Sequence, residues 1–269
     1  MTGRHTRLRK YLGENALETL ESKFVVLVGC GALGSAAASL LVRAGVGRLR
    51  IIDFDVVHET NLGDQCLYSD EAAAQLSQKV DAAAAQLALF NPNVIIEPVA
   101  AMLDRDNALE LCAGAHVIVD GTDNLEAKYL INDVAVKTNT PWIYGGCVGG
   151  HGSVLAVIPH QTACLRCIWP APPPLSNAAT CSAIGLLPTS PAFAAALQVT
   201  EALKILLGRG DEVLEGPLLM DLWQGTIRFQ AGHGGRRHDC PACANAGFEF
   251  LEGSGDAVGG SQWSPSIGM

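Results

Sequence analysis

The sequence lacks a long uncharged apolar run. Its longest apolar-rich stretch, residues 183–207, is interrupted by two prolines and by several polar and charged residues. A membrane-spanning helix needs about 20 consecutive apolar residues, so this stretch is too broken to be one. The first ten residues are basic, but no apolar segment follows them, which excludes the usual pattern of a secretory signal. We therefore expect a soluble, cytoplasmic protein.

Charged residues, and basic residues in particular, are scarce. Only 17% of the 269 residues are charged, 49% are hydrophobic and the mean hydropathy is +0.24, which is the opposite of a disordered composition. The 18 Lys and Arg are outnumbered by 27 Asp and Glu, for a net charge of −9. Proteins that bind nucleic acid by neutralising phosphates carry an excess of positive charge. We expect a packed chain that does not bind nucleic acid.

The nine cysteines include two pairs with the spacing of metal ligands. Cys164 and Cys167 form one C-x2-C pair, and Cys240 and Cys243 form the other. Two such pairs supply the four thiolates of a tetrahedral zinc site, which would fasten the C-terminal segment to the middle of the chain. A redox dithiol at either pair and an iron–sulfur cluster on all four thiolates remain alternatives.

Strand and helix patterns alternate along most of the chain. Helices are expected at 14–22, 35–44, 72–90, 108–113, 126–137 and 192–207, and strands at 24–28, 49–53, 94–98, 117–120, 142–144, 153–158, 218–222 and 226–230. Such alternation predicts an α/β fold with a Rossmann-like, doubly wound and mostly parallel sheet. The last two strands form an expected hairpin that continues this sheet as C-terminal antiparallel strands.

Composition divides the chain into four expected parts. Residues 1–23 form an N-terminal helical arm, and residues 24–150 form a nucleotide-binding, Rossmann-like part. Residues 151–252 form a zinc-stapled part of the same domain. Residues 253–269 are rich in Gly and Ser without periodicity, which is typical of a mobile tail.

A glycine-rich loop, Gly29-Cys-Gly-Ala-Leu-Gly34, follows the first predicted strand and opens a helix. Glycines in this place let the backbone approach a phosphate, and the helix N-terminus offers free N–H groups. Asp53 ends the next strand, where a carboxylate can accept hydrogen bonds from ribose hydroxyls. The loop predicts a nucleotide site, although the glycines could also serve only a tight turn.

A second polar loop, Asp120-Gly-Thr-Asp123-Asn124, follows another apolar strand. Ligands of open α/β sheets bind at the carboxyl ends of the strands, and a carboxylate there can hold a magnesium ion that bridges phosphates. The alternative is a helix N-cap, for which Asp123 or Asn124 would serve equally well.

Several motifs occur together in a fixed order along residues 4–251. They are Arg4-His-Thr-Arg7, the glycine loop, Ile52-Asp-Phe-Asp55, Asn61-Leu62, Lys79, the loop at 120–124, Trp142-Ile-Tyr-Gly-Gly146 and the two cysteine pairs. In this order they resemble the ThiF/MoeB/HesA family of ubiquitin-activating-type adenylyltransferases, with ThiF as the most similar branch.

The resemblance implies adenylation of the C-terminal glycine of a small ubiquitin-like sulfur carrier by ATP and magnesium, for sulfur transfer in cofactor biosynthesis. It implies a carrier of ThiS or MoaD type that ends in Gly-Gly, a homodimer, and a sulfur donor enzyme as a further partner. The resemblance also implies that residues 151–252 bind the carrier. It places the nucleotide contacts on Gly29, Gly31, Ala32, Leu33, Gly34, Asp53, Asp55, Asn61, Lys79, Asp123 and Asn124.

Four of the implied roles are catalytic. Asp123 holds magnesium, Lys79 binds phosphates, and Arg7 reaches the phosphates of the neighbouring subunit. Cys181 matches the loop cysteine that can bond covalently to the carrier.

One departure from the family pattern concerns the phosphate region. The usual Asn-Leu-Gln-Arg-Gln segment reads Asn61-Leu-Gly-Asp64-Gln65 here, so an aspartate stands where an arginine is expected. This exchange leaves a second hypothesis open, in which the chain is a weak or silent zinc scaffold that binds the carrier. A third hypothesis, an NAD-dependent oxidoreductase, explains the glycine loop and Asp53 but neither the loop at 120–124 nor the paired cysteines.

Overall fold

Eight strands form one continuous sheet in the computed structural model, which describes residues 3–172, 184–230 and 235–253. The order across the sheet is β3-β2-β1-β4-β5-β6-β7-β8. The strands are β1 (Phe24–Val28), β2 (Arg48–Ile52), β3 (Ile95–Val99), β4 (Val117–Asp120), β5 (Trp142–Val148), β6 (His151–Val157), β7 (Leu218–Asp221) and β8 (Thr226–Phe229).

The first five strands run parallel, and the last three extend the sheet antiparallel to β5 and to one another. The fold prediction is therefore confirmed, including the C-terminal hairpin of β7 and β8. Because the chain crosses from β3 back to β4 on the other side of β1, the strand order reverses between β1 and β4. Open α/β sheets bind ligands at such a reversal.

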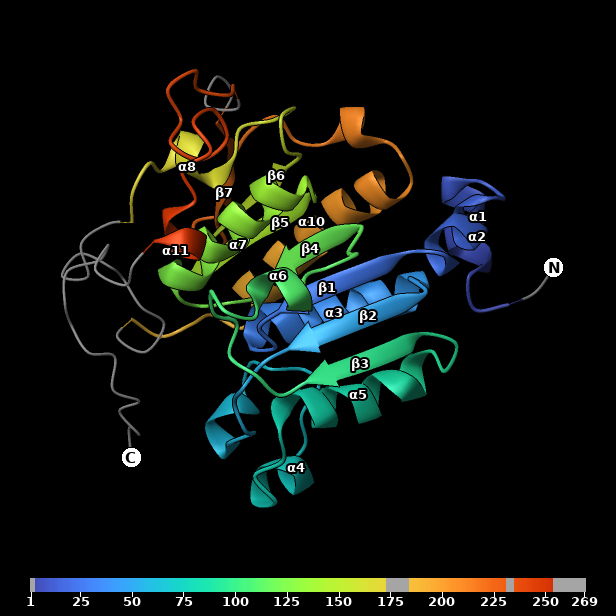
Figure 1. Ribbon diagram of the computed structural model, residues 1–269. Coiled ribbons are helices and arrows are strands. Elements are labelled where there is room, and N and C mark those ends of the chain that lie inside the picture. The colour runs from blue at the N-terminus through green and yellow to red at the C-terminus, as the bar shows by residue number, and fades with distance from the viewer. Residues whose placement is uncertain (1–2, 173–183, 231–234, 254–269) are drawn as a thin grey trace.

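Helices cover both faces of the sheet (Figure 1). One face carries α3 (Ala32–Ala44), α5 (Lys79–Phe90) and α10 (Thr189–Leu206), and the other carries α6 (Ala108–Leu111), α7 (Leu125–Thr138), α8 (Leu165–Ile168) and α11 (Glu249–Glu252). The remaining helices are short: α1 (Thr6–Leu12), α2 (Ala16–Glu21), α4 (Asp70–Ala74) and the 3-10 turns η1 (Glu59–Asn61) and η3 (Gly210–Glu212).

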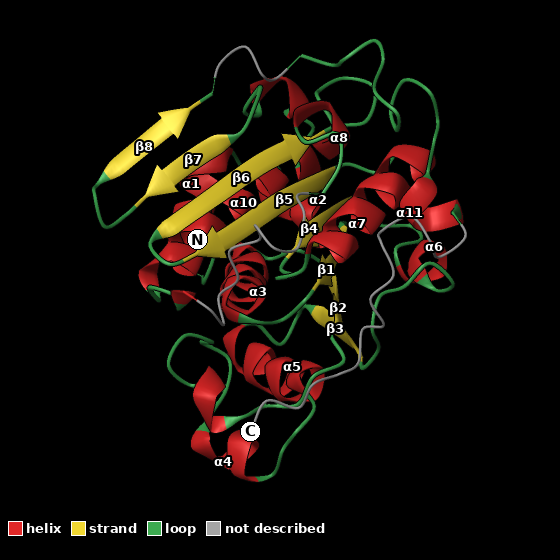
Figure 2. Ribbon diagram, turned by 90° about the vertical axis from the view of Figure 1, so that its left-hand side faces the viewer, coloured by secondary structure: helices red, strands yellow, loops and turns green. Residues whose placement is uncertain are grey.

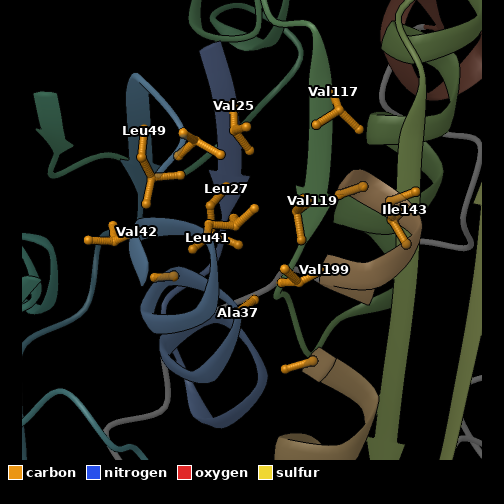
Figure 3. Packing of buried hydrophobic residues seen from close by; sticks show 14 of the residues in the cluster. Val25, Leu27, Ala37, Leu41, Val42, Leu49, Val117, Val119, Ile143 and Val199 are labelled. Atoms are coloured by element: carbon orange, nitrogen blue, oxygen red, sulfur yellow. The ribbon is translucent and has the colours of Figure 1, made fainter. Parts of the chain in front are cut away.

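The core follows directly from the apolar strands. All five residues of β1 are buried, with Val25 and Leu27 facing α3 and Val26 facing α7. Side chains of α3 and α10 point at the sheet from below (Figure 3). A strand buried on both faces reads as a continuous apolar run, which is why the sequence identified β1.

The N-terminal arm, α1 and α2, lies beyond the amino ends of the parallel strands (Figure 1). Arg4 donates to the side chain of Asn91 at the end of α5, and a Cβ on Gly45 would lie 3.0 Å from the His5 ring. The arm thus sits at the opposite end of the sheet from the strand carboxyl ends. No helix among the described residues is long and apolar enough to cross a membrane.

The single helix expected at 72–90 is wrong. The structure has two helices, α4 and α5, separated by residues 75–78, where Leu76 adopts a left-handed φ of 49°. Val57 donates its N–H to the Ser77 carbonyl at 2.8 Å, so pairing with the loop after β2 interrupts the helix. The strand expected at 142–144 also continues to Val148 through two glycines.

The C-terminal segment folds back onto α7. The rings of Tyr129 and Phe250 lie 4.9 Å apart, and the Phe250 N–H donates to Asp133 at 3.0 Å. The view in Figure 2 shows α11 beside α7, on the far side of the sheet from α3. The sequence did not predict α11, and the expected tail beyond Gly253 lies outside the described residues.

Candidate active site and metal centre

The glycine loop and the loop at 120–124 meet where the strand order reverses. The Gly121 N–H donates to the Val28 carbonyl at 2.7 Å. A Cβ on Gly29, which has φ +85°, would lie 2.7 Å from Gly121, and one on Gly34 would lie 2.0 Å from the Gly29 carbonyl oxygen. These three glycines are therefore required by the packing of the two loops.

Gly31 differs from its neighbours because nothing lies within 4 Å of the Cβ it lacks. It is the N-cap of α3 and makes no side-chain cap, so packing gives no reason for a glycine there. Open space at a helix N-terminus is where a phosphate can approach backbone N–H groups. The adjacent Cys30 is not a nucleophile, because burial raises the pKa of its thiol to about 12.

Asp53 is fixed by the backbone of both neighbouring loops. Its Oδ2 accepts from the Cys30 N–H at 2.6 Å, and its Oδ1 accepts from the Asp55 N–H at 2.8 Å. Burial is the main cause that raises its pKa, while the Lys79 charge and these two hydrogen bonds act in the opposite direction. Each oxygen keeps one further lone pair, so the carboxylate can still accept from a ligand hydroxyl.

Lys79 is the first residue of α5, and its side chain is only 8% exposed. Its Nζ lies 3.0 Å from Oδ2 of Asp55. Asp64 lies near enough for the Lys79 charge to lower its pKa, although burial is the larger effect and the net shift is upward. The Oδ1 atom of Asp64 is buried without a hydrogen-bond partner.

Asn61 closes the 3-10 turn η1. Its Oδ1 accepts the His58 N–H at 2.9 Å in a capping box. The side chain therefore has a structural role in the same loop as Asp64, and its amide Nδ2 is free to donate within the part of the chain that the structure describes.

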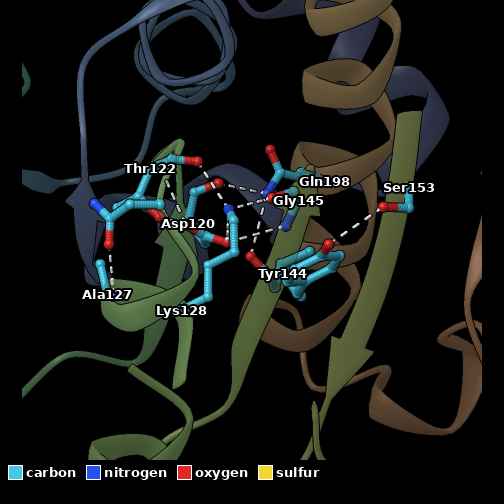
Figure 4. Close-up of polar contacts among 10 residues, drawn as sticks. Asp120, Thr122, Ala127, Lys128, Tyr144, Gly145, Ser153 and Gln198 are labelled. Carbon is cyan, nitrogen blue, oxygen red and sulfur yellow. Dashed lines mark hydrogen bonds and ion pairs between the residues drawn. The ribbon is translucent and has the colours of Figure 1, made fainter. Parts of the chain in front are cut away.

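A buried ion pair supports the loop at 120–124, and the sequence gave no indication of it. Lys128 Nζ lies 2.8 Å from Oδ2 of Asp120, and it also donates to the carbonyls of Thr122 at 2.8 Å and Gly145 at 2.6 Å. Oδ1 of Asp120 accepts from both the N–H and the hydroxyl of Thr122. Figure 4 shows this cluster between β4 and β5.

The choice between Asp123 and Asn124 as helix cap is settled by the geometry. Asn124 is the N-cap of α7, and its Oδ1 accepts the Ala127 N–H at 2.8 Å. Asp123 is exposed, and no hydrogen bond or ion pair within residues 3–172, 184–230 and 235–253 involves its carboxylate. Asp123 is therefore available to a ligand, and Asn124 has a structural role.

The four paired cysteines lie together, as the sequence predicts. All four are buried, and their Sγ atoms lie within 4.8 Å of one another. The Sγ atoms of Cys164 and Cys167 are 3.8 Å apart, those of Cys164 and Cys240 are 3.5 Å apart, and those of Cys167 and Cys243 are 3.4 Å apart.

These distances fit a metal and exclude bonded sulfurs. Four sulfurs about 2.3 Å from one zinc lie about 3.8 Å from each other, whereas a disulfide bond is about 2.05 Å long. Hydrogen bonding from Cys164 holds the pKa of Cys167 below its ordinary value. The group is thus compatible with zinc.

The surrounding contacts show what the cysteine group fastens. Arg166, between the first two cysteines, is buried and pairs with Glu249 at 2.7 Å. Arg236 donates to the carbonyl of Cys243 at 3.1 Å and to that of His160. Residues 235–253 are therefore held against α7 and α8 by contacts of protein side chains.

Of the predicted catalytic residues that the structure describes, Arg7 does not lie at this site. Arg7 is exposed on α1, where Gly3, Arg4, Thr6, Arg7 and Lys10 line an open concavity of about 500 Å³. Because α1 lies at the amino end of the sheet (Figure 1), Arg7 lies away from Asp123 of its own chain. Cys181 lies outside the described residues.

Sequence comparison identifies relatives along nearly the whole chain. A model of the ThiF family matches residues 2–242. The sulfur carrier protein ThiS adenylyltransferase of Bacillus subtilis (strain 168) is 37% identical over 256 residues, which cover 93% of this chain and 74% of that protein. The sulfur carrier protein adenylyltransferase of Thermus thermophilus is 35% identical over 240 residues, or 87% of each chain.

A solved structure shares the fold at lower identity. The chain superimposes on E. coli MccB, solved with MccA-N7isoASN, with a TM-score of 0.79. The match covers 90% of this chain and 74% of MccB at 21% identity. The sheet and its helical layers therefore occur in a protein with little sequence similarity to this one.

Proposed function

Because the chain belongs to the ThiF family, we propose that it adenylates the C-terminal glycine of a small ubiquitin-like sulfur carrier protein. Two relatives are adenylyltransferases of sulfur carrier proteins by name. The observation that carries the proposal is the free carboxylate of Asp123, which lies in the loop at 120–124, packed against the glycine loop. It offers a metal ligand beside a candidate phosphate site.

The proposed reaction exchanges one phosphorus–oxygen bond for another. An oxygen of the carrier carboxylate attacks the α-phosphorus of ATP, and the bond to the α,β-bridging oxygen breaks. Pyrophosphate leaves with its electron pair, and the carrier ends as an acyl-adenylate. Two anions approach each other in this step, so the site must provide cations that offset their repulsion.

We assign the nucleotide to the space above Gly31 and the N-terminus of α3, with the ribose hydroxyls at Asp53. The backbone bonds that Asp53 accepts from Cys30 and Asp55 support this, because they fix the carboxylate before a ligand arrives. In this arrangement Lys79 faces the phosphates. Its ion pair with Asp55 holds the ammonium group at the N-terminus of α5.

Asp123 would hold magnesium, which when bound to ATP neutralises phosphate charge. Its exposure and its lack of a capping role support this assignment. Cys164, Cys167, Cys240 and Cys243 would hold one zinc ion with a structural role, since four protein ligands leave no open position for chemistry. We propose a cytoplasmic location, where thiols stay reduced.

Three further parts of the proposal concern partners. A homodimer would let Arg7 reach the partner's phosphates. The Cys181 thiolate would attack the acyl carbon of the adenylate and form a thioester with the carrier, with AMP as the leaving group. Sulfide-level sulfur from a separate donor would then displace the Cys181 thiolate and leave the carrier as a thiocarboxylate. Intact-mass analysis of the carrier and of Cys181→Ser protein tests the last two steps. A thiocarboxylate that forms equally well without Cys181 excludes its role.

The alternatives explain less of the structure. A nicotinamide oxidoreductase would explain neither the free Asp123 nor the four-cysteine group. Membership of the ThiF family also disfavours this alternative. The silent carrier-binding scaffold is favoured by one observation, the half-buried Asp64 near Lys79. Turnover measurements separate it from an active enzyme.

The direct test is carrier-dependent exchange of labelled pyrophosphate into ATP. We expect exchange with wild type and loss of at least about 100-fold in Asp123→Ala. The matched control is Glu126→Ala, an exposed carboxylate removed three residues later in the first turn of α7. Exchange that survives in Asp123→Ala, or is lost equally in both variants, contradicts the assignment of Asp123.

A further inference from the structure

Lys128 makes three hydrogen bonds from one ammonium group. Its acceptors lie on three separate parts of the chain: Oδ2 of Asp120 at the end of β4, the carbonyl of Thr122 in the loop, and the carbonyl of Gly145 in β5. An ammonium has three protons, so all of them are used. The side chain is 4% exposed and Asp120 is fully buried.

The charge of this lysine is maintained by its surroundings. Burial alone lowers the pKa of Lys128, but the Asp120 carboxylate, with smaller effects from Tyr144 and Asp123, outweighs burial, so the pKa lies above its ordinary value. The Tyr144 ring centre lies 5.1 Å from Nζ, and the Tyr144 hydroxyl contacts Ser153. Figure 4 shows Tyr144 on the β5 side of the ion pair.

The network fixes the backbone immediately before Asp123. Asp120 accepts hydrogen bonds from the N–H and the hydroxyl of Thr122, and Lys128 donates a hydrogen bond to the Thr122 carbonyl. On the other side of Asp123, Asn124 is held as the cap of α7. Both neighbours of Asp123 are therefore held in place, although its own carboxylate contacts neither of them.

A buried ion pair adds little stability compared with apolar residues of similar volume, so stability alone does not account for it. We infer that Lys128 is a positioning residue that sets the location of Asp123 for a divalent metal bound with ATP. It acts through the Thr122 carbonyl and touches neither metal nor nucleotide. The inference rests on the metal role of Asp123 in the proposed function.

Mn²⁺ binding tests the inference without turnover. We would measure Mn²⁺ affinity by electron paramagnetic resonance, with the full chain and a non-hydrolysable ATP analogue. The variant is Asp120→Asn/Lys128→Met, which removes one negative and one positive charge and so leaves the net charge unchanged. A change in affinity then reports the position of Asp123. Residues that orient metal ligands from outside typically affect affinity by about 10–100-fold, and we expect a loss of that size.

Two single variants serve as controls. Lys128→Arg keeps the positive charge and several donors, and we expect it to lose less Mn²⁺ affinity than the double variant. Lys137→Met removes an exposed lysine from the same helix, where it pairs with Glu252, and should bind Mn²⁺ as wild type does. If the double variant does not fold, Thr122→Val removes only the hydroxyl bond to Asp120 and should show a smaller loss in the same direction.

The inference is wrong if the double variant folds and binds Mn²⁺ as wild type does, or if Lys128→Arg is as weak as the double variant. It is also wrong if wild type binds no Mn²⁺ with the analogue. The proposed function can fail separately. A wild type that binds Mn²⁺ and the analogue but shows no carrier-dependent exchange would contradict adenylation and leave the positioning role of Lys128 supported by the variants.

Discussion

Lys79 Nζ lies 3.0 Å from Oδ2 of Asp55, so this buried cation reaches the candidate nucleotide site already paired with an anion. Asp53 and Asp64 also lie close enough to interact with its charge. A triphosphate bound here adds more negative charge, which makes the electrostatic balance of the site the main question for catalysis.

Replacing Asp64 changes this balance most directly. We expect Asp64→Arg to raise the rate of pyrophosphate exchange, because it replaces a repelling carboxylate by a cation near the phosphates. The gain is bounded by the roughly 10³–10⁵-fold effect of catalytic arginines in other phosphoryl-transfer enzymes. Asp64→Asn removes the charge without adding one and should give an intermediate rate. A rate that falls in both variants contradicts this account of Asp64.

Arg7 is predicted to act on the partner subunit. If so, Arg7→Ala and Asp123→Ala proteins should each be inactive alone, yet recover activity when unfolded together and refolded as a mixture. In a random mixture of symmetric dimers, half are mixed and each mixed dimer has one intact site, so about one quarter of wild-type activity should return. Lack of recovery in a mixture shown to contain mixed dimers would refute the exchange of Arg7 between subunits.

Sequence patterns predicted the elements whose signal is local. The continuous apolar run of β1 and the glycine loop after it correspond to a strand buried on both faces and to the start of α3. The spacing of the cysteine pairs predicted the four-sulfur group, because each pair lies within a single turn of the chain. Alternation of strands and helices predicted a mostly parallel sheet, whereas the strand order, with its reversal between β1 and β4, comes from the structure.

Features that depend on distant partners could not be predicted. The break at Leu76 arises because Ser77 pairs with Val57, and the alanine-rich segment around it has helical composition throughout. The link from Lys128 to Gly145 spans 17 residues and two elements. Asp123 and Asn124 have similar capping preferences, so only the geometry distinguishes the cap from the free carboxylate.

The cysteine group should bind one zinc ion per chain. We expect elemental analysis to find one zinc in wild type and in Cys66→Ser, a control that removes an exposed cysteine outside the group. Cys164→Ser and Cys240→Ser should lose it. Because binding of a structural zinc contributes to folding, a chelator should expose residues 235–253 to hydrogen exchange before the sheet. Iron in place of zinc, or no metal, contradicts this prediction.

Asp133 makes stability depend on pH. Burial raises its pKa to about 6 from 3.8, although the Phe250 N–H and the Arg166 charge favour the ionised form. The folded protein therefore retains a proton that the unfolded chain releases as pH rises from about 4 to about 6. The free energy of unfolding should fall across that window by at most about 3 kcal/mol.

Asp133→Asn removes this titration. Denaturant unfolding at several pH values measures this effect. The free energy of unfolding of the variant should not fall between pH 4 and 6, and the variant should be more stable than wild type at pH 7. Asp81→Asn, at an exposed position in the first turn of α5, should keep the wild-type pH profile. Identical profiles for wild type and Asp133→Asn would show that folding leaves the pKa of Asp133 unchanged.

The proposed function of this chain is to form an adenylate on the carboxylate of a carrier. Its most direct measurement is the intact mass of a Gly-Gly-ending carrier after incubation with the protein, ATP and magnesium. We predict a mass increase of one adenylyl group that requires the terminal glycine and is absent with Asp123→Ala protein. A carrier of unchanged mass and no released pyrophosphate, with carriers of both ThiS and MoaD type, would contradict the account.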